Sequence, residues 1–201
     1  MVAIIDYDAG NIMSVKKAVE HLGRKAVISR SRDEILNADH VILPGVGAFG
    51  DAADRIRSYG LEETIKECVD KGIPFLGICL GLQLLFESSE ESEGVKGLSI
   101  LKGRILKIPQ GDHEKIPHMG WNSLELMNDG RLLKGIDNGS YVYFVHSYYL
   151  KAEDEGIVRA VTEYNTRIHA CVEKDNVFAC QFHPEKSSET GLKILDNFLD
   201  I

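Results

Sequence analysis

The sequence of 201 residues lacks features that mark several classes of protein. Its four cysteines include no C-x-x-C pair, which leaves neither zinc-ribbon spacing nor the disulfide framework of a small secreted protein. Basic residues are the minority, with 23 Lys and Arg against 31 Asp and Glu and a formal net charge of −8. General binders of nucleic acid or anionic membranes need a basic surface, so we expect no partner of either kind.

Long apolar runs are also missing. A long stretch without a charged residue, Ile73 to Phe86, is interrupted by Pro74 and Gln83. It is shorter than the ~18 residues that a membrane span needs. The first residues, MVAIIDYDAG, have no basic segment ahead of an apolar one and do not resemble a secretory signal. We therefore expect a soluble, cytoplasmic protein with reduced thiols.

Hydrophobic residues make up 44% of the chain, which is enough for a packed core. At roughly 100–200 residues per domain, the length predicts a single domain over residues 1–201. The first half alternates short β-branched runs with amphipathic ones, which predicts an α/β fold with helices around a mostly parallel central sheet. The expected strands are 2–5, 25–28, 40–43 and 73–78, and the expected helices are 11–23, 51–59 and 61–71.

The second half has a different pattern. Residues 87–93, ESSEESE, predict a solvated acidic linker. After it, short β-branched or aromatic runs are separated by Gly, Asn or Asp, which favours additional antiparallel strands. The expected strands are 98–101, 104–108, 121–126, 141–149, 157–163, 168–173 and 177–182. An apolar face at Leu192, Leu195, Phe198 and Leu199 predicts a final helix.

The strongest local motif is GICLG, which ends the apolar run 73–78. A nucleophile on a sharp turn from strand to helix needs small neighbours, and Gly77 and Gly81 supply them on either side of Cys79. The start of a helix also favours the reactive thiolate. The motif predicts Cys79 as a catalytic nucleophile. The alternative is a buried structural thiol, which is what we expect of Cys68.

A thiolate nucleophile needs a base, and the base needs an acid that orients it. In the motif FHPE, Pro184 favours an extended backbone at His183. Residues i and i+2 of an extended segment face the same side. We therefore expect Glu185 to bind one nitrogen of His183 and to leave the other for Cys79. Catalysis by His183 as base and acid requires a pKa near neutrality.

Two patterns suggest ligands that we do not expect. His118 and His146 are conceivable metal ligands, but the sequence offers no convergent third ligand, so no metal is predicted. The segment GVGAFG, residues 45–50, matches the dinucleotide fingerprint G-x-G-x-x-G. It follows the third strand rather than the first, and the next strand ends without the acid that would bind a ribose.

An acyl-transfer site also needs donors that stabilise an oxyanion. The backbone N–H groups of Val46 and Gly47, after a buried strand, and of Leu80, beside the nucleophile, are the expected donors. Glycine tolerates positive φ, so Gly45 and Gly47 allow the peptide planes beside Val46 to rotate. We expect a loop that rests with a carbonyl towards the site and turns an N–H inward when a ligand-bound partner presses on it.

Together these motifs carry a family resemblance. GICLGLQLLFE with FHPEKSS is similar to the class I, or triad, glutamine amidotransferases, and PGVGAFGD, PHMGWN and YFVHSYY resemble members that serve histidine biosynthesis. The resemblance implies a flavodoxin-like α/β domain that hydrolyses L-glutamine to glutamate and ammonia through a thioester, without a cofactor. It also implies that Cys79 is the nucleophile, His183 the base and acid, and Glu185 the residue that orients His183.

The resemblance implies binding positions as well. Glutamine is held by Gly47, Gln83, Ser147 and Tyr148, with Glu91 as a weaker candidate. Ammonia passes to a (β/α)8-barrel synthase subunit in a heterodimer. The positions that face this subunit and the ammonia passage are Asn11, Met119, Trp121, Asn122, Tyr143 and Lys186. Trp121 is the single tryptophan of the chain, a residue type that often anchors a partner.

Three alternatives stay open. The chain could be another triad glutaminase, such as one that serves pyridoxal phosphate synthesis, which ammonia transfer to a given synthase would decide. It could be a flavodoxin-like module that binds nucleotide or flavin at residues 45–50, which absorbance of a bound cofactor would reveal. It could also be a noncatalytic redox or scaffold protein, in which case a reactive Cys79 would turn over no glutamine.

Overall fold

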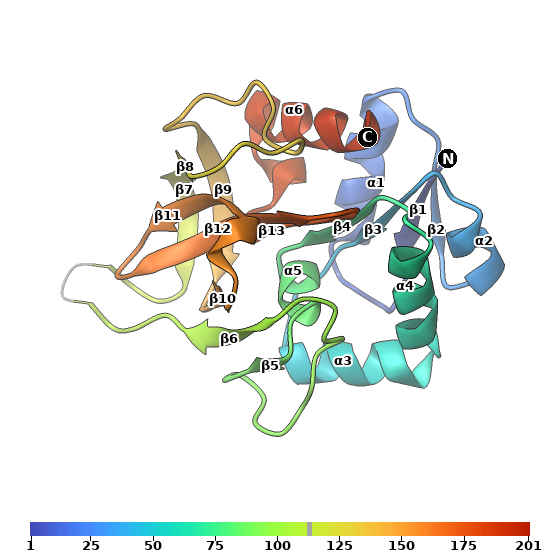
Figure 1. Ribbon diagram of the computed structural model, residues 1–201, viewed down its shortest axis with the longest axis horizontal. Coiled ribbons are helices and arrows are strands. Elements are labelled where there is room, and N and C mark those ends of the chain that lie inside the picture. The colour runs from blue at the N-terminus through green and yellow to red at the C-terminus, as the bar shows by residue number, and fades with distance from the viewer. Residues whose placement is uncertain (112–113) are drawn as a thin grey trace.

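The computed structural model in Figure 1 describes residues 1–111 and 114–201. Its centre is an eight-stranded sheet with the strand order β2-β1-β3-β4-β13-β12-β11-β8. Strands β2 to β13 in this order pair in parallel, and β12, β11 and β8 continue the sheet with antiparallel pairs. The bounds are β1 Val2–Ile5, β2 Ala26–Ser29, β3 His40–Leu43, β4 Phe75–Ile78, β8 Glu125–Leu126, β11 Val158–Glu163, β12 Arg167–Lys174 and β13 Val177–Cys180.

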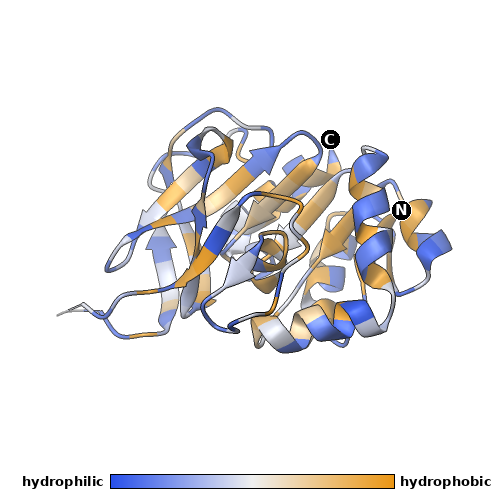
Figure 2. Cartoon of the chain, turned by 60° about the horizontal axis from the view of Figure 1, so that its bottom comes forward, coloured by the Kyte–Doolittle hydropathy of each residue, from blue (hydrophilic) through white to orange (hydrophobic). Residues whose placement is uncertain are grey.

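Helices cover both faces of this sheet (Figure 1). On one face lie α1 (Ile12–His21) and α6 (Ser188–Leu199). The other face carries α2 (Arg32–Leu36), α3 (Phe49–Ser58), α4 (Leu61–Asp70) and α5 (Leu80–Leu84). Alternate residues of a strand point to opposite faces, and both faces here are buried, so β1 and β4 are apolar throughout and β3 is apolar after His40 (Figure 2). The α/β class with a mostly parallel sheet is confirmed.

Two smaller sheets are built from the second half of the chain. One has the order β10-β6-β5, from β5 (Ser88–Ser89), β6 (Gly103–Lys107) and β10 (Tyr148–Ala152). The other pairs β7 (His118–Ser123) with β9 (Tyr141–His146). Short 3-10 turns occur at Glu155–Ile157 and Pro184–Lys186. Within the two described ranges, no helix has the length and apolar composition that crossing a membrane requires.

Several predicted strands were wrong in detail. Residues 98–101 form no strand, because the N–H groups of Ile100 and Leu101 donate to the carbonyl of Leu85 at the end of α5. The predicted strand 121–126 is divided between β7 and β8, and 141–149 is divided between β9 and β10. In each case the two halves pair in different sheets, which a hydrophobic pattern does not reveal. Helix α2 was not predicted.

The acidic segment 87–93 is solvated at Glu87, Glu90 and Glu93, as its composition predicted, but it is not a linker. Its carboxylates accept hydrogen bonds from backbone N–H groups of other segments. Glu87 accepts from Gly103 N at 3.0 Å, and Glu91 accepts from Phe49 N at 2.7 Å, at the first residue of α3. A carboxylate at a helix N-terminus is stabilised by the free N–H groups and the helix dipole there. The segment is therefore an ordered part of the structure beside α3.

Candidate active site

Three neighbouring strands of the central sheet end at the same edge. Strands β3, β4 and β13 are adjacent and parallel, with Leu43 opposite Gly77 and Cys180 opposite Ile78. The carboxyl ends of parallel strands lie on one edge of the sheet, which is where α/β proteins place ligands. The segments that follow these strands carry the predicted oxyanion loop, nucleophile and base. The strand order thus brings together segments that are far apart in the sequence.

The turn between β4 and α5 has the geometry that the GICLG motif predicts. Cys79 lies between strand and helix with φ 55° and ψ −106°, a left-handed backbone that non-glycine residues seldom adopt. A Cβ at Gly81 would lie 1.9 Å from the carbonyl oxygen of Leu43, and one at Gly77 would lie 2.8 Å from that of Gly81. The two glycines therefore allow the close packing of α5 against β3 and β4 that holds Cys79 at the strand end.

His183 and Glu185 are adjacent inside the protein, and both side chains are fully buried. Nδ1 of His183 lies 2.7 Å from Oε1 of Glu185. The contact was predicted from a fully extended segment, and this was only partly right. His183 is extended, but Pro184–Lys186 form a 3-10 turn. Asn11 also donates from Nδ2 to Oε1 of Glu185. Its side chain, which was predicted to face a partner, thus contacts the candidate triad.

The surroundings of His183 favour its charged form. Burial by itself would lower the pKa of the imidazole, but the interactions with Cys79 and Glu185 outweigh burial and raise the pKa to about 9. The pKa predicted for His183 from its catalytic role was near neutrality. Nε2 of His183 makes no hydrogen bond to the described residues, so this nitrogen is available for the sulfur or for a bound substrate. A cationic imidazole beside a cysteine is a common arrangement for stabilising a thiolate.

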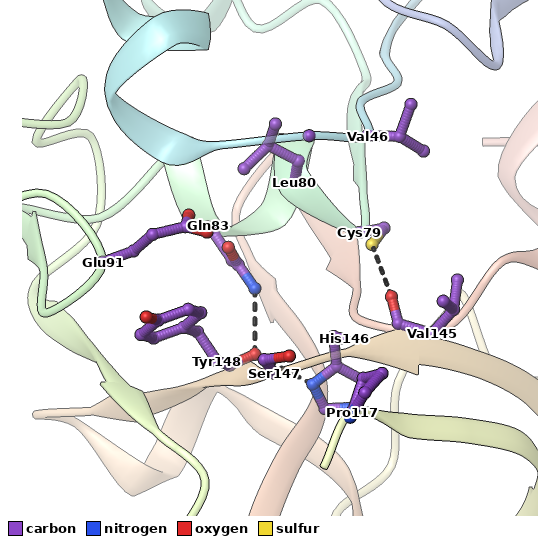
Figure 3. A pocket seen from close by; sticks show the side chains of 11 residues that line it. Val46, Cys79, Leu80, Gln83, Glu91, Pro117, Val145, His146, Ser147 and Tyr148 are labelled. Atoms are coloured by element: carbon purple, nitrogen blue, oxygen red, sulfur yellow. Dashed lines mark hydrogen bonds between the residues drawn. The ribbon is translucent and has the colours of Figure 1, made fainter.

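A pocket of about 290 Å³ opens beside Cys79 (Figure 3). In Figure 3, Gln83, Leu80 and Val46 lie on one side of the pocket, and the segment from Val145 to Tyr148 lies on the other. The lining residues are Val46, Gly47, Cys79, Leu80, Gln83, Glu91, Pro117, Val145, His146, Ser147 and Tyr148. The residues that the resemblance assigns to glutamine binding, and the oxyanion donors predicted from the motifs, thus line one pocket with Cys79.

The side chain of Gln83 has a defined orientation in this pocket. Its Nε2 donates to the carbonyl oxygen of Tyr148 at 3.0 Å and to Oε1 of Gln181 at 3.1 Å (Figure 3 shows the first bond). A backbone carbonyl only accepts, so the amide nitrogen of Gln83 must face Tyr148. Both N–H groups of Gln83 are then in use, and its Oε1 is the atom left to accept a hydrogen bond from a ligand.

The two glycines of the predicted oxyanion loop differ in their surroundings. A Cβ at Gly45 would lie 2.2 Å from the hydroxyl oxygen of Tyr7, so this glycine permits close packing. Gly47 has φ +105° and open space around its Cβ position, so it permits an unusual backbone conformation. The N–H of Leu80, one expected oxyanion donor, donates to the carbonyl oxygen of Gly45 over a long 3.3 Å.

The imidazole rings of His118 and His146 lie within hydrogen-bonding distance of each other. Nδ1 of His118 lies 3.0 Å from Nε2 of His146, whose Nδ1 lies 2.8 Å from the carbonyl oxygen of Tyr148. Burial lowers the pKa of His118 to about 4 and that of His146 to about 3. Both rings are therefore neutral at physiological pH and support the pocket wall at Tyr148. The described part of the chain contains no group of three His, Cys, Asp or Glu side chains placed to hold a metal ion.

The predicted partner positions divide between two faces of β7 and β9. Met119 and Trp121 are 62% and 52% exposed, and Trp121 packs edge-on against Tyr143, its register partner. Successive residues of a strand alternate between faces, so Asn122 points the other way and donates to the carbonyl oxygen of Glu163 at 3.0 Å. Tyr141 adds an exposed ring to the Met119 side. Lys186, in the turn after His183, is also exposed.

One residue at the site was missed from the sequence. Gln181 is fully buried, and its Nε2 lies 3.7 Å from the sulfur of Cys79. It is the single polar residue in the run VFACQF, residues 177–182. A lone amide in an otherwise apolar strand was the available signal, since a buried polar group needs a partner.

Comparisons with known proteins show the family of the chain. Residues 3–201 match the family glutamine amidotransferase class-I. The chain is 55% identical to the imidazole glycerol phosphate synthase subunit HisH of Caldanaerobacter subterraneus subsp. tengcongensis, over 98% of this chain and 97% of that protein. It is 52% identical to the subunit of the same name from Methanocaldococcus jannaschii, over the full length of both.

Solved structures show the same fold at lower identity. A crystal structure of a glutamine amidotransferase superposes with a TM-score of 0.77 at 20% identity, covering 100% of this chain and 98% of its own. The structure of PurLQS from Thermotoga maritima gives a TM-score of 0.77 at 22% identity, covering 99% and 97%.

Proposed function

The chain belongs to the class-I glutamine amidotransferase family, and we propose that it is the subunit that supplies ammonia to an imidazole glycerol phosphate synthase. It is an enzyme that takes nitrogen from L-glutamine for histidine biosynthesis. The observation that carries this proposal is the placement of Cys79, His183 and Glu185 after the neighbouring strands β4 and β13, with Cys79 lining a pocket. The identity of about half its residues to HisH subunits over their whole length supports the choice among triad glutaminases.

In the proposed mechanism, Cys79 is the nucleophile and His183 the acid and base. The sulfur attacks the amide carbon of glutamine, and the C–N bond then breaks to leave a thioester. His183 is protonated at neutral pH, given its raised pKa of about 9, so it can donate the proton that the departing ammonia needs. The neutral imidazole then takes a proton from water, which attacks the thioester and releases glutamate. Glu185, bound to Nδ1, orients the ring.

Glutamine binding is proposed for the pocket residues that the sequence singled out. Gln83 presents Oε1 as an acceptor, because its N–H groups are occupied. Ser147 and Tyr148 supply backbone groups, and Gly47 and Val46 supply their N–H groups to the oxyanion. The N–H of Leu80 joins them once it leaves the carbonyl oxygen of Gly45. Glu91 is a weaker candidate, because its Oε2 already accepts from Phe49 N. No metal or other cofactor enters this mechanism.

The surface formed by Met119, Trp121, Tyr141 and Tyr143 is the proposed docking site for a (β/α)8-barrel synthase subunit. This surface lies close to the nucleophile, because Met119 pairs with Val145, whose carbonyl oxygen lies 3.9 Å from Sγ of Cys79 (Figure 3). Ammonia released at Cys79 would have a short path into such a partner. The partner then makes imidazole glycerol phosphate and an aminoimidazole-carboxamide ribotide.

The domain organisation and the cellular location that we propose are consistent with this function. A single domain over residues 1–201 is supported by the central sheet, which takes strands from both halves of the chain. A cytoplasmic location suits an enzyme whose four cysteines are free thiols.

The direct test is a glutamate-release assay with the purified chain, run with and without a synthase subunit. We expect glutamine-dependent glutamate release that increases with the partner and its nucleotide ligand. Absence of turnover under all these conditions, despite a reactive Cys79, would contradict the proposal and favour a noncatalytic thiol protein.

Replacing Trp121 by alanine is expected to weaken the complex with the synthase subunit by about tenfold or more, because an exposed aromatic ring is a typical energetic centre of an interface. Size-exclusion chromatography should show one copy of each chain in the wild-type complex, and a binding titration gives the loss. Met127→Ala removes another exposed apolar side chain, 45% accessible, from a different segment and should leave binding unchanged. Unchanged binding and coupling in Trp121→Ala would refute the assigned surface.

Replacing Gly47 by alanine is expected to lower the partner-stimulated glutaminase rate by about 10²–10³ and to change glutamine affinity little, since one oxyanion donor is worth that factor. Alanine tolerates φ +105° poorly, although its Cβ would meet nothing within 4 Å. Gly72→Ala is a matched control, with φ +74° and equally open space after α4. Full activity of the isolated chain, unaffected by partner and ligand, would contradict gating at this loop.

A further inference from the structure

The side chain of Gln181 has both of its polar ends in the active site. Gln181 follows β13 directly and is fully buried. Its Nε2 lies 3.7 Å from the sulfur of Cys79, and its Oε1 accepts a hydrogen bond of 3.1 Å from Nε2 of Gln83. It therefore connects the nucleophile with a residue that lines the pocket.

A buried amide at position 181 destabilises the fold unless its polar atoms make hydrogen bonds. A buried amide without hydrogen bonds costs about 1–3 kcal/mol, and the neighbours Cys180 and Phe182 are fully buried and apolar. The fold itself needs only the backbone here, where Gln181 N donates to the carbonyl oxygen of Ala170 at 2.9 Å. An aliphatic side chain would fill the same space without the cost. Both side-chain contacts of Gln181 are made to site residues, so its polarity serves the site.

The direction of these hydrogen bonds is determined by their partners. The carbonyl of Tyr148 can only accept, so Gln83 directs its amide nitrogen towards Tyr148 and towards Gln181. Gln181 must then present its oxygen to Gln83, and its own amide nitrogen faces Cys79. The sulfur thus has a fixed N–H donor beside it.

This donor favours the ionised form of Cys79. As a thiol, the sulfur can direct its proton to the carbonyl oxygen of Val145 at 3.9 Å. As a thiolate, it has no proton to share and is repelled by that carbonyl, so it depends on donors. A hydrogen bond to a charged acceptor is roughly twice as strong as one between neutral groups, and a bond to the charged form favours ionisation.

We propose that Gln181 is a catalytic residue whose amide N–H stabilises the thiolate of Cys79 and links the sulfur to Gln83 in the pocket. The proposal rests on Cys79 as the nucleophile of the glutaminase proposed above. Because Gln83 also lines the pocket proposed to bind glutamine, the same chain of amides would hold the sulfur in place while glutamine is bound.

The test is the pH dependence of Cys79 alkylation in the full chain. Iodoacetamide is the probe, mass spectrometry locates the adduct at Cys79, and rates are measured from pH 5 to 10. Gln181→Met keeps the length of the side chain and loses the N–H donor. In this variant we expect the midpoint of the curve of alkylation rate against pH to rise by about one pH unit. At any pH below that midpoint, alkylation of Cys79 should then be about tenfold slower than in the wild type. Gln181→Glu, which keeps the shape and adds a negative charge, should raise the midpoint further. In the complex, kcat should fall more than KM rises.

Gln110→Met is the matched control, because Gln110 is exposed, and its alkylation profile should equal that of the wild type. Circular dichroism checks that each variant is folded, and the isosteric Gln181→Glu carries the test if Gln181→Met is not. A wild-type midpoint in both Gln181 variants would overturn the proposal and leave the triad intact. A Cys79 that resists alkylation in the wild type at every pH would overturn the nucleophile and the proposal together.

Discussion

Replacing Cys79 by alanine is expected to abolish glutamate release, with a loss on the order of 10⁴–10⁶ in rate, because a side chain that forms the covalent intermediate has no substitute. The fold should persist, because alanine is smaller than cysteine and its Cβ is already accommodated at φ 55°. Binding to the synthase subunit should also persist, because Cys79 is only 6% exposed. Glutamate release and complex formation are measured on the same preparation.

Cys68→Ala is the control for this variant. Cys68 is a fully buried free thiol on α4, outside the residues that line the pocket. Its replacement should cost some stability, as cavities in a core do, and leave glutamate release near the wild-type rate. If Cys79→Ala instead released glutamate as fast as the wild type, the thioester mechanism would be excluded.

The local part of this site could be predicted from the sequence. Gly77 and Gly81 around Cys79 carry a steric requirement that any strand-to-helix turn of this kind imposes, and a Cβ at Gly81 would indeed lie 1.9 Å from a carbonyl oxygen. Strands β1, β3 and β4 could also be predicted from their apolar runs, because strands buried on both faces are mostly apolar. Requirements of this kind act over a few residues and leave a pattern in the sequence.

The convergence of the site could not be derived from local patterns. His183 reaches Cys79 because β13 inserts beside β4 in the sheet, although about one hundred residues separate the two strands in the chain. No periodicity encodes which strand becomes the neighbour of which. That His183 serves Cys79 was predicted from the motif FHPE and from the base that a thiolate nucleophile requires, and not from the position of β13 in the sheet. The contact of Glu185 with His183 was predicted, but through an extended segment rather than the 3-10 turn that forms it.

The predictions that were wrong have a common cause in tertiary hydrogen bonding. In residues 98–101, backbone N–H groups donate to the carbonyl oxygen of Leu85 at the end of α5 and not to a neighbouring strand. In the acidic segment 87–93, carboxylates accept hydrogen bonds from backbone N–H groups of other segments. Gln181 was overlooked because hydrophobic pattern assigns it to a buried strand. These roles depend on partners distant in the sequence, where composition carries no information.

Replacing Glu185 by glutamine is expected to produce the second large effect, a loss of up to ~10⁴ in kcat/KM by analogy with serine triads, and less here because cysteine is the stronger nucleophile. The shape of the side chain is kept, and an amide oxygen can still accept from Nδ1 of His183 and from Asn11. The lost element is the negative charge. Glu185→Gln therefore tests the electrostatic role of the carboxylate apart from its packing.

The pH profile separates this role from a structural one. Cys79 and Glu185 together raise the pKa of His183 to about 9 against the effect of burial, so removal of one charge lowers that pKa. The imidazolium is then lost at lower pH, and the alkaline limb of kcat/KM should move to lower pH in Glu185→Gln. The raised pKa also implies that stability gained from the charged His183 is present below the unfolded-state pKa of about 6.5 and is lost as pH rises through 9.

The experiment compares the complex of each variant with the synthase subunit from pH 5 to 10, with thermal unfolding measured in parallel. Glu189→Gln removes an exposed carboxylate from the first turn of α6, and its profile should match the wild type. If Glu185→Gln had a normal rate and an unchanged alkaline limb of the kcat/KM profile, Glu185 would contribute to packing only. A lower rate with the limb unmoved would show that Glu185 acts by orienting His183, and that the attraction of the cationic ring to Cys79 alone keeps it charged.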